Sequence, residues 1–248
     1  MSGFENTELL LLVKLVLAHC ISDFALQPAS WVVERSEKKY RSKYLYIHAI
    51  VTGLVVQTLT QSWYLTALIF ITHLLIDLSK AYAKPTTSNF LIDQLLHLAI
   101  IGFAWLFFVD GRLNANILLN NYPVMVLLTG YFMVTYPFGI LIKVCTQRWR
   151  KPTGLLNSEH NSNETITDAE WNDLQEAGRW IGMIERLLIV TFVLFDHYDA
   201  IGLLIAGKTI IRFKESDKKK SEYFLFGTLL SIALSIFVGL AIKMLVRL

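Results

Sequence analysis

The segment WYLTALIFITHLLIDLSKAYA, residues 63–83, is the stretch that decides the fold class. Its acidic and basic side chains are His73, Asp77 and Lys80, and most of the others are apolar. A transmembrane helix needs about 20 consecutive, mainly apolar residues. The segment therefore predicts a helix that spans a membrane and carries ionisable groups within it.

Apolar segments of similar length recur along the 248 residues of the chain. The composition is 54% hydrophobic and 17% charged, with a mean hydropathy of +0.47, which is too apolar for an ordinary soluble domain. The candidate spans are 8–27, 44–62, 63–83, 90–109, 122–143, 180–196, 198–213 and 223–246. We expect an all-α polytopic membrane protein with about eight (7–8) transmembrane helices. Segments 180–196 and 198–213 are short, and whether both span stays open.

Two regions are expected. Residues 1–110 would form a four-span membrane bundle, and residues 111–248 would add further spans, a soluble cytoplasmic loop at 146–177 and a basic loop at 212–222. Within the soluble loop, Thr167 and Glu170 resemble a capping box, which predicts a short helix running into the sixth span. Aromatic residues near the span ends are typical of interfacial anchors, so a lipid bilayer, and no nucleic acid, is the expected partner.

Lysine and arginine predict the orientation. They gather after the first, third, fifth and seventh candidate spans, at 35–43, 80–84, 148–151 and 212–220. Such loops face the cytoplasm under the positive-inside rule, so both termini are expected outside. Lys243 and Arg247 near the C-terminus oppose this assignment mildly.

Three His/Asp pairs at i,i+4 spacing lie inside the apolar front third of the chain. They are His19 with Asp23, His73 with Asp77, and Asp93 with His97; His48 is a seventh polar residue. Residues four apart share one helix face. Ends of odd spans and starts of even spans lie on the same side of the membrane, so the pairs are expected at one depth near the cytoplasmic surface, where they could line one cavity of a helix bundle.

Imidazole and carboxylate are ligands for zinc, iron or manganese. We therefore expect a divalent metal, with zinc as a candidate, bound by His19, His48, His73 and His97. Asp23, Asp77 and Asp93 would complete the coordination shell or act as general base, and Lys80 would stabilise negative charge. Gln27 and Gln94 would orient a substrate. The competing interpretations are a proton or ion relay and a structural polar network.

The second half carries its own polar residues. Arg179, Arg186, Lys208 and Arg212 could hold an anionic lipid headgroup. For Glu185 and Arg186, pairing with other polar groups inside the helices is the favoured interpretation. Lys208 and Arg212 also follow the positive-inside rule.

Several of these residues carry a resemblance to a known family. Ala18-His19, Asp23-Phe24, Leu26-Gln27, His48, His73 with Asp77, Phe90-Leu91-Ile92-Asp93-Gln94 and His97 resemble a family of bacterial integral membrane proteins that is known as a domain of unknown function. The resemblance covers about the first 110 residues. It implies a multi-pass protein of the bacterial inner membrane and supplies no activity.

The leading functional hypothesis is a metal-dependent membrane hydrolase that acts, from the cytoplasmic side, on a lipid or lipid-linked substrate. The residue types are similar to those of membrane-bound metal-dependent hydrolases, which is an analogy and does not fix function. The alternatives are a small transporter or ion-coupled permease that uses the His/Asp residues as a relay, and a non-catalytic membrane scaffold. Substrate and oligomeric state stay open.

Overall fold

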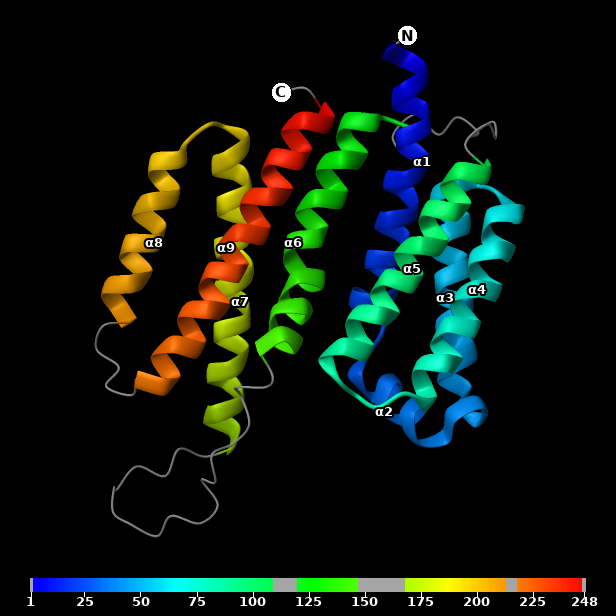
Figure 1. Ribbon diagram of the computed structural model, residues 1–248, viewed down its shortest axis with the longest axis horizontal. Coiled ribbons are helices and arrows are strands. Elements are labelled where there is room, and N and C mark those ends of the chain that lie inside the picture. Colours follow the sequence, from blue (N-terminus) through cyan, green and yellow to red (C-terminus); the bar gives the residue numbers. More distant parts are fainter. Residues whose placement is uncertain (1, 109–119, 147–167, 213–217, 247–248) are drawn as a thin grey trace. The chain divides into compact units, whose positions relative to one another are not determined.

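The computed structural model describes residues 2–108, 120–146, 168–212 and 218–246 (Figure 1). Over these residues the chain is helical and contains no strand. The elements are α1 (Ser2–Cys20), the π-helical turn η1 (Ile21–Ala25), α2 (Ala29–Lys38), the 3-10 turn η2 (Lys39–Arg41), α3 (Lys43–Thr60), α4 (Trp63–Tyr82), α5 (Thr87–Phe108), α6 (Tyr122–Thr146), α7 (Asp168–Leu194), α8 (Tyr198–Arg212) and α9 (Lys218–Val246). The all-α prediction is confirmed for this part of the chain.

Fewer helices qualify as membrane spans than the sequence predicts. Among the described residues, α4, α5, α6 and residues 225–246 of α9 are long and apolar enough to cross a membrane. The bent pair 8–25 and 29–41 raises the number from four to five. α8 has 15 residues, which at about 1.5 Å per residue falls short of a hydrocarbon core of about 30 Å. The count of eight stays a prediction.

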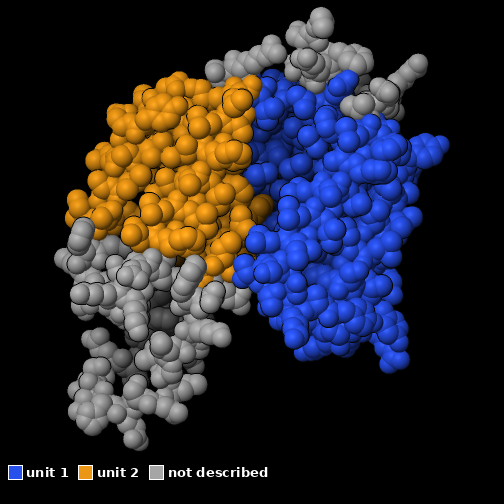
Figure 2. All heavy atoms as spheres, in the orientation of Figure 1, with its two compact units in different colours: residues 1–133, 245–247 blue, residues 134–244, 248 orange. Residues whose placement is uncertain are grey.

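The chain divides into two compact units, residues 1–133 with 245–247 and residues 134–244 with 248 (Figure 2). The predicted boundary at 110/111 lies outside the described residues. So does most of the predicted soluble loop, but its end is helical, because α7 begins at Asp168. Likewise, α9 begins at Lys218, inside the predicted basic loop 212–222.

In the first unit, four long helices pack in a closed ring. α1 contacts α3 and α5, and α4 contacts the same two helices from the other side (Figure 1). Leu15, Leu45 and Val56 are fully buried in its interior. Many outward side chains are apolar and more than half exposed, including Leu54, Leu106 and Phe107. The ring thus has an apolar outer surface, as a membrane requires.

A helix replaces the loop that the sequence predicts after the first span. α2 starts behind Pro28, whose fixed φ and missing N–H suit a helix start. The segment that contains α2 is bent by 82° from the segment 8–25. α2 packs on α3 and α4, so Arg35 is buried against α4 and does not lie in an open basic loop.

In the second unit, α7 packs against α8. Ile189, Val193 and Ile201 form its buried core. Arg186 of α7 donates to the backbone oxygens of Val134 and Thr135 in α6, next to Pro137, which removes a helix hydrogen bond.

Candidate metal centre

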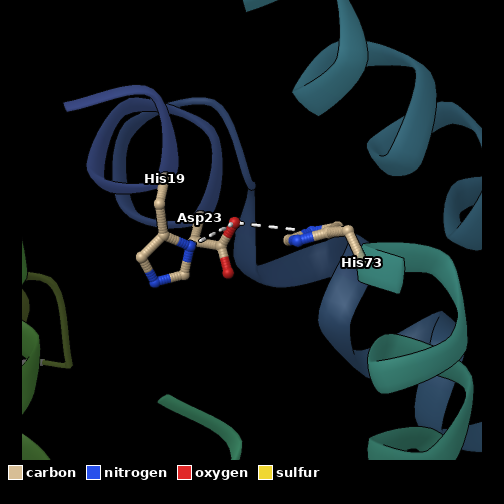
Figure 3. A group of neighbouring side chains, drawn as sticks. All are labelled: His19, Asp23 and His73. Atoms are coloured by element: carbon tan, nitrogen blue, oxygen red, sulfur yellow. Dashed lines mark ion pairs between the residues drawn. The ribbon is translucent and has the colours of Figure 1, made fainter. Parts of the chain in front are cut away.

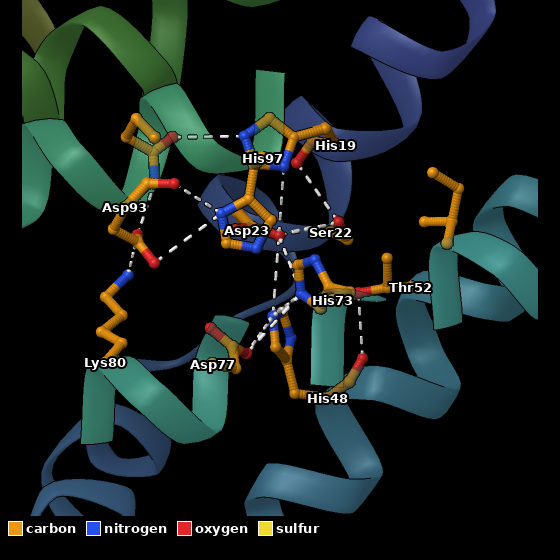
Figure 4. Close-up of polar contacts among 12 residues, drawn as sticks. His19, Ser22, Asp23, His48, Thr52, His73, Asp77, Lys80, Asp93 and His97 are labelled. Atoms are coloured by element: carbon orange, nitrogen blue, oxygen red, sulfur yellow. Dashed lines mark hydrogen bonds and ion pairs between the residues drawn. The ribbon is translucent and has the colours of Figure 1, made fainter. Parts of the chain in front are cut away.

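The three His/Asp pairs and His48 converge inside the ring of the first unit (Figure 4). His19 ends α1, Asp23 lies in η1, His48 in α3, His73 and Asp77 in α4, and Asp93 and His97 in α5. All seven side chains are buried, with 1–7% of their surface exposed. The structure therefore brings the seven predicted ligands and carboxylates together.

The π-helical turn η1 positions Asp23. Such turns are rare and occur frequently at functional sites. The carboxylate oxygen Oδ1 of Asp23 accepts a 3.0 Å hydrogen bond from Ser22 Oγ. The same oxygen lies 3.6 Å from His19 Nδ1 and 3.5 Å from His73 Nε2 (Figure 3). One carboxylate oxygen is thus shared between histidines of two helices.

Four polar atoms come closest together: His48 Nε2, His73 Nε2, Asp23 Oδ1 and Asp77 Oδ2. The two nitrogens are 3.0 Å apart. His48 Nε2 lies 3.6 Å from Asp23 Oδ1 and 3.4 Å from Asp77 Oδ2. His73 Nε2 lies 3.5 Å and 3.6 Å from the same two oxygens. Ligands of a tetrahedral zinc site at about 2.0–2.1 Å from the metal are about 3.3–3.4 Å apart, so these spacings match such a site.

Neighbouring donors hold the carboxylates of this group. Arg35 of α2 donates to Asp77 Oδ2, and both side chains are almost fully buried. Ser22 holds Asp23. Hydrogen-bonded carboxylates of this kind are typical around metal ligands. Arg35 and Ser22 were not predicted as site residues, and the sequence carries no local signal for either contact.

Asp93 and His97 form a second part of the cluster. Lys80 Nζ lies 2.5 Å from Asp93 Oδ2, and Gln94 Nε2 donates to the same oxygen at 3.0 Å. Gln94 Oε1 accepts from His19 Nε2 at 3.2 Å, which leaves Nδ1 of His19 as the acceptor nitrogen. His97 Nδ1 donates to the backbone oxygen of Asp93 at 2.8 Å. The predicted Lys80 and Gln94 therefore do contact the cluster.

A small cavity adjoins the histidines. Its volume is about 20 Å³, which suffices for one water molecule or ion. Its walls are mainly aliphatic and are formed by Leu15, His19, Thr52, Val56, Ile69, Thr72, His73, Ile76, His97, Ile100 and Ile101. The imidazole rings also form a contiguous series, with centroids 4.9 Å apart for His48 and His73, 4.5 Å for His73 and His97, and 5.0 Å for His97 and His19.

Three overlapping groups could each hold a metal ion: His19, Asp23 and His73; His48, His73 and Asp77; and Asp77, Asp93 and His97. The cluster contains three carboxylates and two cationic partners, Arg35 and Lys80. With neutral imidazoles, negative charge is left in excess. Buried charge without a partner is costly, and a divalent cation would neutralise it.

The remaining predicted substrate-binding residues lie elsewhere. Gln27 follows the end of η1 and belongs to no helix. Arg179 is exposed and pairs with Glu176 at 2.8 Å. Arg186 binds backbone oxygens of α6, and Lys208 pairs with Glu185. The side chain of Arg212 lies outside the described residues. A lipid headgroup at these cations stays a prediction.

Comparison with known proteins gives a family but no activity. No curated protein and no solved structure matches the chain. Residues 11–126 match the family described as a protein of unknown function, DUF3307. The matched region contains all seven His and Asp residues of the cluster together with Arg35, Lys80 and Gln94. Residues 11–126 of this protein are thus a DUF3307 domain, a member of a family whose function is uncharacterised.

Proposed function

We propose that the DUF3307 domain is a metal-dependent hydrolase embedded in the bacterial inner membrane, with a divalent cation, zinc being the leading candidate, held by Asp23, His48, His73 and Asp77. The observation that carries this proposal is the near-tetrahedral spacing of four buried ligand atoms from η1, α3 and α4, at 3.0–3.6 Å. Two of the four ligands are carboxylates, each held by a neighbouring donor.

A membrane location is supported by the helices themselves. α4 and α5 are long and apolar enough to span, and the bent pair 8–25 and 29–41 adds a further candidate. In our proposal α1, α3, α4 and α5 form a four-span bundle with the cluster near the cytoplasmic surface. A substrate that reaches buried residues between such helices must itself partition into the bilayer, so we propose a lipid or lipid-linked substrate.

The residues around the four ligands suit hydrolysis. A bound zinc ion supplies a water whose pKa falls to about 7. His19 lines the cavity beside the ligands, and its hydrogen bond to Gln94 leaves Nδ1 free to accept a proton from that water. Lys80, at 2.5 Å from Asp93, brings positive charge to the opposite part of the cluster, where it would stabilise the negative charge that develops on the substrate.

A second candidate function is a proton or ion relay in a small transporter. The contiguous series of four imidazole rings favours it, because neighbouring rings are 4.5–5.0 Å apart and buried His and Asp chains serve as proton relays in transporters. A relay needs no bound metal, so metal content separates the two functions.

The metal content of full-length protein purified in detergent, without chelator or a metal-affinity step, tests the proposal. Plasma mass spectrometry is expected to find a divalent transition metal in stoichiometric amount. Asp77→Asn and His48→Ala should lose it. His197→Ala is the matched control, because His197 is an exposed histidine on the turn between α7 and α8. Wild-type protein free of stoichiometric metal would contradict the hydrolase.

Turnover is tested separately. Metal-loaded protein is incubated with vesicles of bacterial lipid, and water-soluble or newly cleaved lipid products are followed by mass spectrometry. His19→Ala is expected to keep the metal and lose at least about 100-fold in rate, the usual contribution of a general base. Proton flux into liposomes by metal-free protein would instead support the relay.

A further inference from the structure

We propose that the cluster binds a second divalent cation, held by Asp77, Asp93 and His97, so that the carboxylate of Asp77 bridges two metals. This inference rests on the proposed function, because Asp77 Oδ2 is a ligand of the first cation. It adds a separate site with its own ligands on α4 and α5.

Unpaired polar atoms carry the inference. Asp77 Oδ1, Asp93 Oδ1 and His97 Nε2 are each buried from solvent and have no hydrogen-bond partner. The side chains they belong to are 1–4% exposed. Buried polar atoms are almost always paired, and each exception calls for an explanation such as a missing ion. Three exceptions on three adjacent side chains point to one shared guest.

The three side chains are close enough to hold one ion. Each offers a ligand atom, and these atoms lie within 4.8 Å of one another. Asp77 is common to this group and to the group with His48 and His73. In two-metal sites the ions are about 3.5–4 Å apart, a separation that a single carboxylate bridges with its two oxygens.

The hydrogen bonds around the group prepare the ligands for this role. His97 Nδ1 carries the proton, because its partner is the backbone oxygen of Asp93, which can only accept. Nε2 is therefore the nitrogen with the free lone pair. Lys80 and Gln94 both donate to Asp93 Oδ2 and leave Oδ1 available. Arg35 likewise donates to Asp77 Oδ2 and leaves Oδ1 available.

Charge also favours a second cation. Asp23, Asp77 and Asp93 all belong to one buried cluster. A proton shared by Asp77 and Asp93 is the competing arrangement. It would neutralise one carboxylate, whereas a cation engages both carboxylates and the imidazole at once.

Manganese titration of metal-free, full-length protein in detergent tests the inference by electron paramagnetic resonance and by the metal-to-protein ratio. Wild-type protein is expected to bind two Mn²⁺ per chain with a spin-coupled spectrum. Asp93→Asn and His97→Ala should bind one, with the six-line spectrum of an isolated ion. His197→Ala should behave as wild type. His97→Gln, which preserves more of the side-chain volume, replaces His97→Ala if that variant does not fold.

The outcomes separate this inference from the proposed function. One uncoupled Mn²⁺ in wild-type protein, lost in Asp23→Asn but retained in His97→Ala, would overturn the second site and leave the first intact. No Mn²⁺ in wild-type protein would overturn both. Since the wild-type stoichiometry alone distinguishes one site from two, the test does not depend on any variant folding.

Discussion

At the residue scale, Arg35 is the contact on which the geometry of Asp77 depends. Its side chain is 3% exposed and donates to the 1% exposed carboxylate of Asp77. Removal of one partner from a buried ion pair leaves an uncompensated charge and costs about 3–5 kcal/mol. Arg35→Met is therefore expected to lower stability by about that amount in metal-free protein, and to weaken metal binding about 10–100-fold because the outer partner of a ligand is lost.

Thermal unfolding and titration calorimetry in detergent would measure these two effects. Lys38→Met is the matched control, since Lys38 is a cation of the same helix that is 58% exposed and pairs only with Glu34. A surface change of that kind is expected to alter stability by no more than about 0.5 kcal/mol. Equal stability and equal metal affinity in Arg35→Met and Lys38→Met would show that Arg35 does not support Asp77.

The cluster residues could be predicted from the sequence, but their partners could not. Spacing of i,i+4 places His73 and Asp77 on one helix face whatever the rest of the chain does, and span alternation places the three pairs at one depth. The pair of Arg35 with Asp77 joins residues 42 positions apart. It exists because α2 turns back on α4, which no periodicity encodes.

At the element scale, helix type was predictable and helix detail was not. Apolar runs correctly predicted α3, α4, α5 and α6, because about 20 apolar residues favour one structure in a membrane. The π-helical turn that holds Asp23 and the helix α2 were missed. A π turn has no composition signal of its own, and the cations of 35–43 suggested an open loop through the positive-inside rule.

Close packing of α7 and α9 gives an element-scale prediction. A Cβ built on Gly239 of α9 would lie 2.7 Å from Val193 Cγ1 and 2.8 Å from Val193 Cβ, and Val193 is fully buried in α7. Gly239→Ala is therefore expected to force these helices apart and destabilise the second unit by about 1–3 kcal/mol. Thermal unfolding in detergent measures the change.

Gly202→Ala in α8 is the control, because a Cβ there meets no atom within 4 Å. It should leave stability unchanged or raise it by up to about 1 kcal/mol through helix propensity. If both variants unfolded at the wild-type temperature, α7 and α9 would not be packed as closely as the structure has them.

At the scale of the whole molecule, the order of helices in the ring was beyond prediction. Depth follows from span alternation, but whether His48 of α3 faces His73 of α4 depends on how each helix is rotated. Closure of the ring by α1 against α5 brings His19 within 3.2 Å of Gln94 across 75 residues of sequence. Such contacts arise from the packing of complete helices, and a single sequence has no record of them.

The division into two units predicts where metal acts on stability. All proposed ligands belong to residues 1–133, and the other unit, residues 134–244 with 248, contributes none. A ligand present at 100 times its dissociation constant stabilises the state that binds it by about 2.7 kcal/mol, which corresponds to about 100-fold less opening. Removal of metal with a chelator is therefore expected to accelerate amide hydrogen exchange by up to about 100-fold in α3, α4 and α5, and to leave α7 and α9 unchanged. Mass spectrometry of peptides from each helix measures this directly. Asp77→Asn, already free of metal, should show the accelerated pattern with and without chelator. Equal acceleration in both units, or none in α3, α4 and α5, would contradict a metal centre confined to the DUF3307 domain.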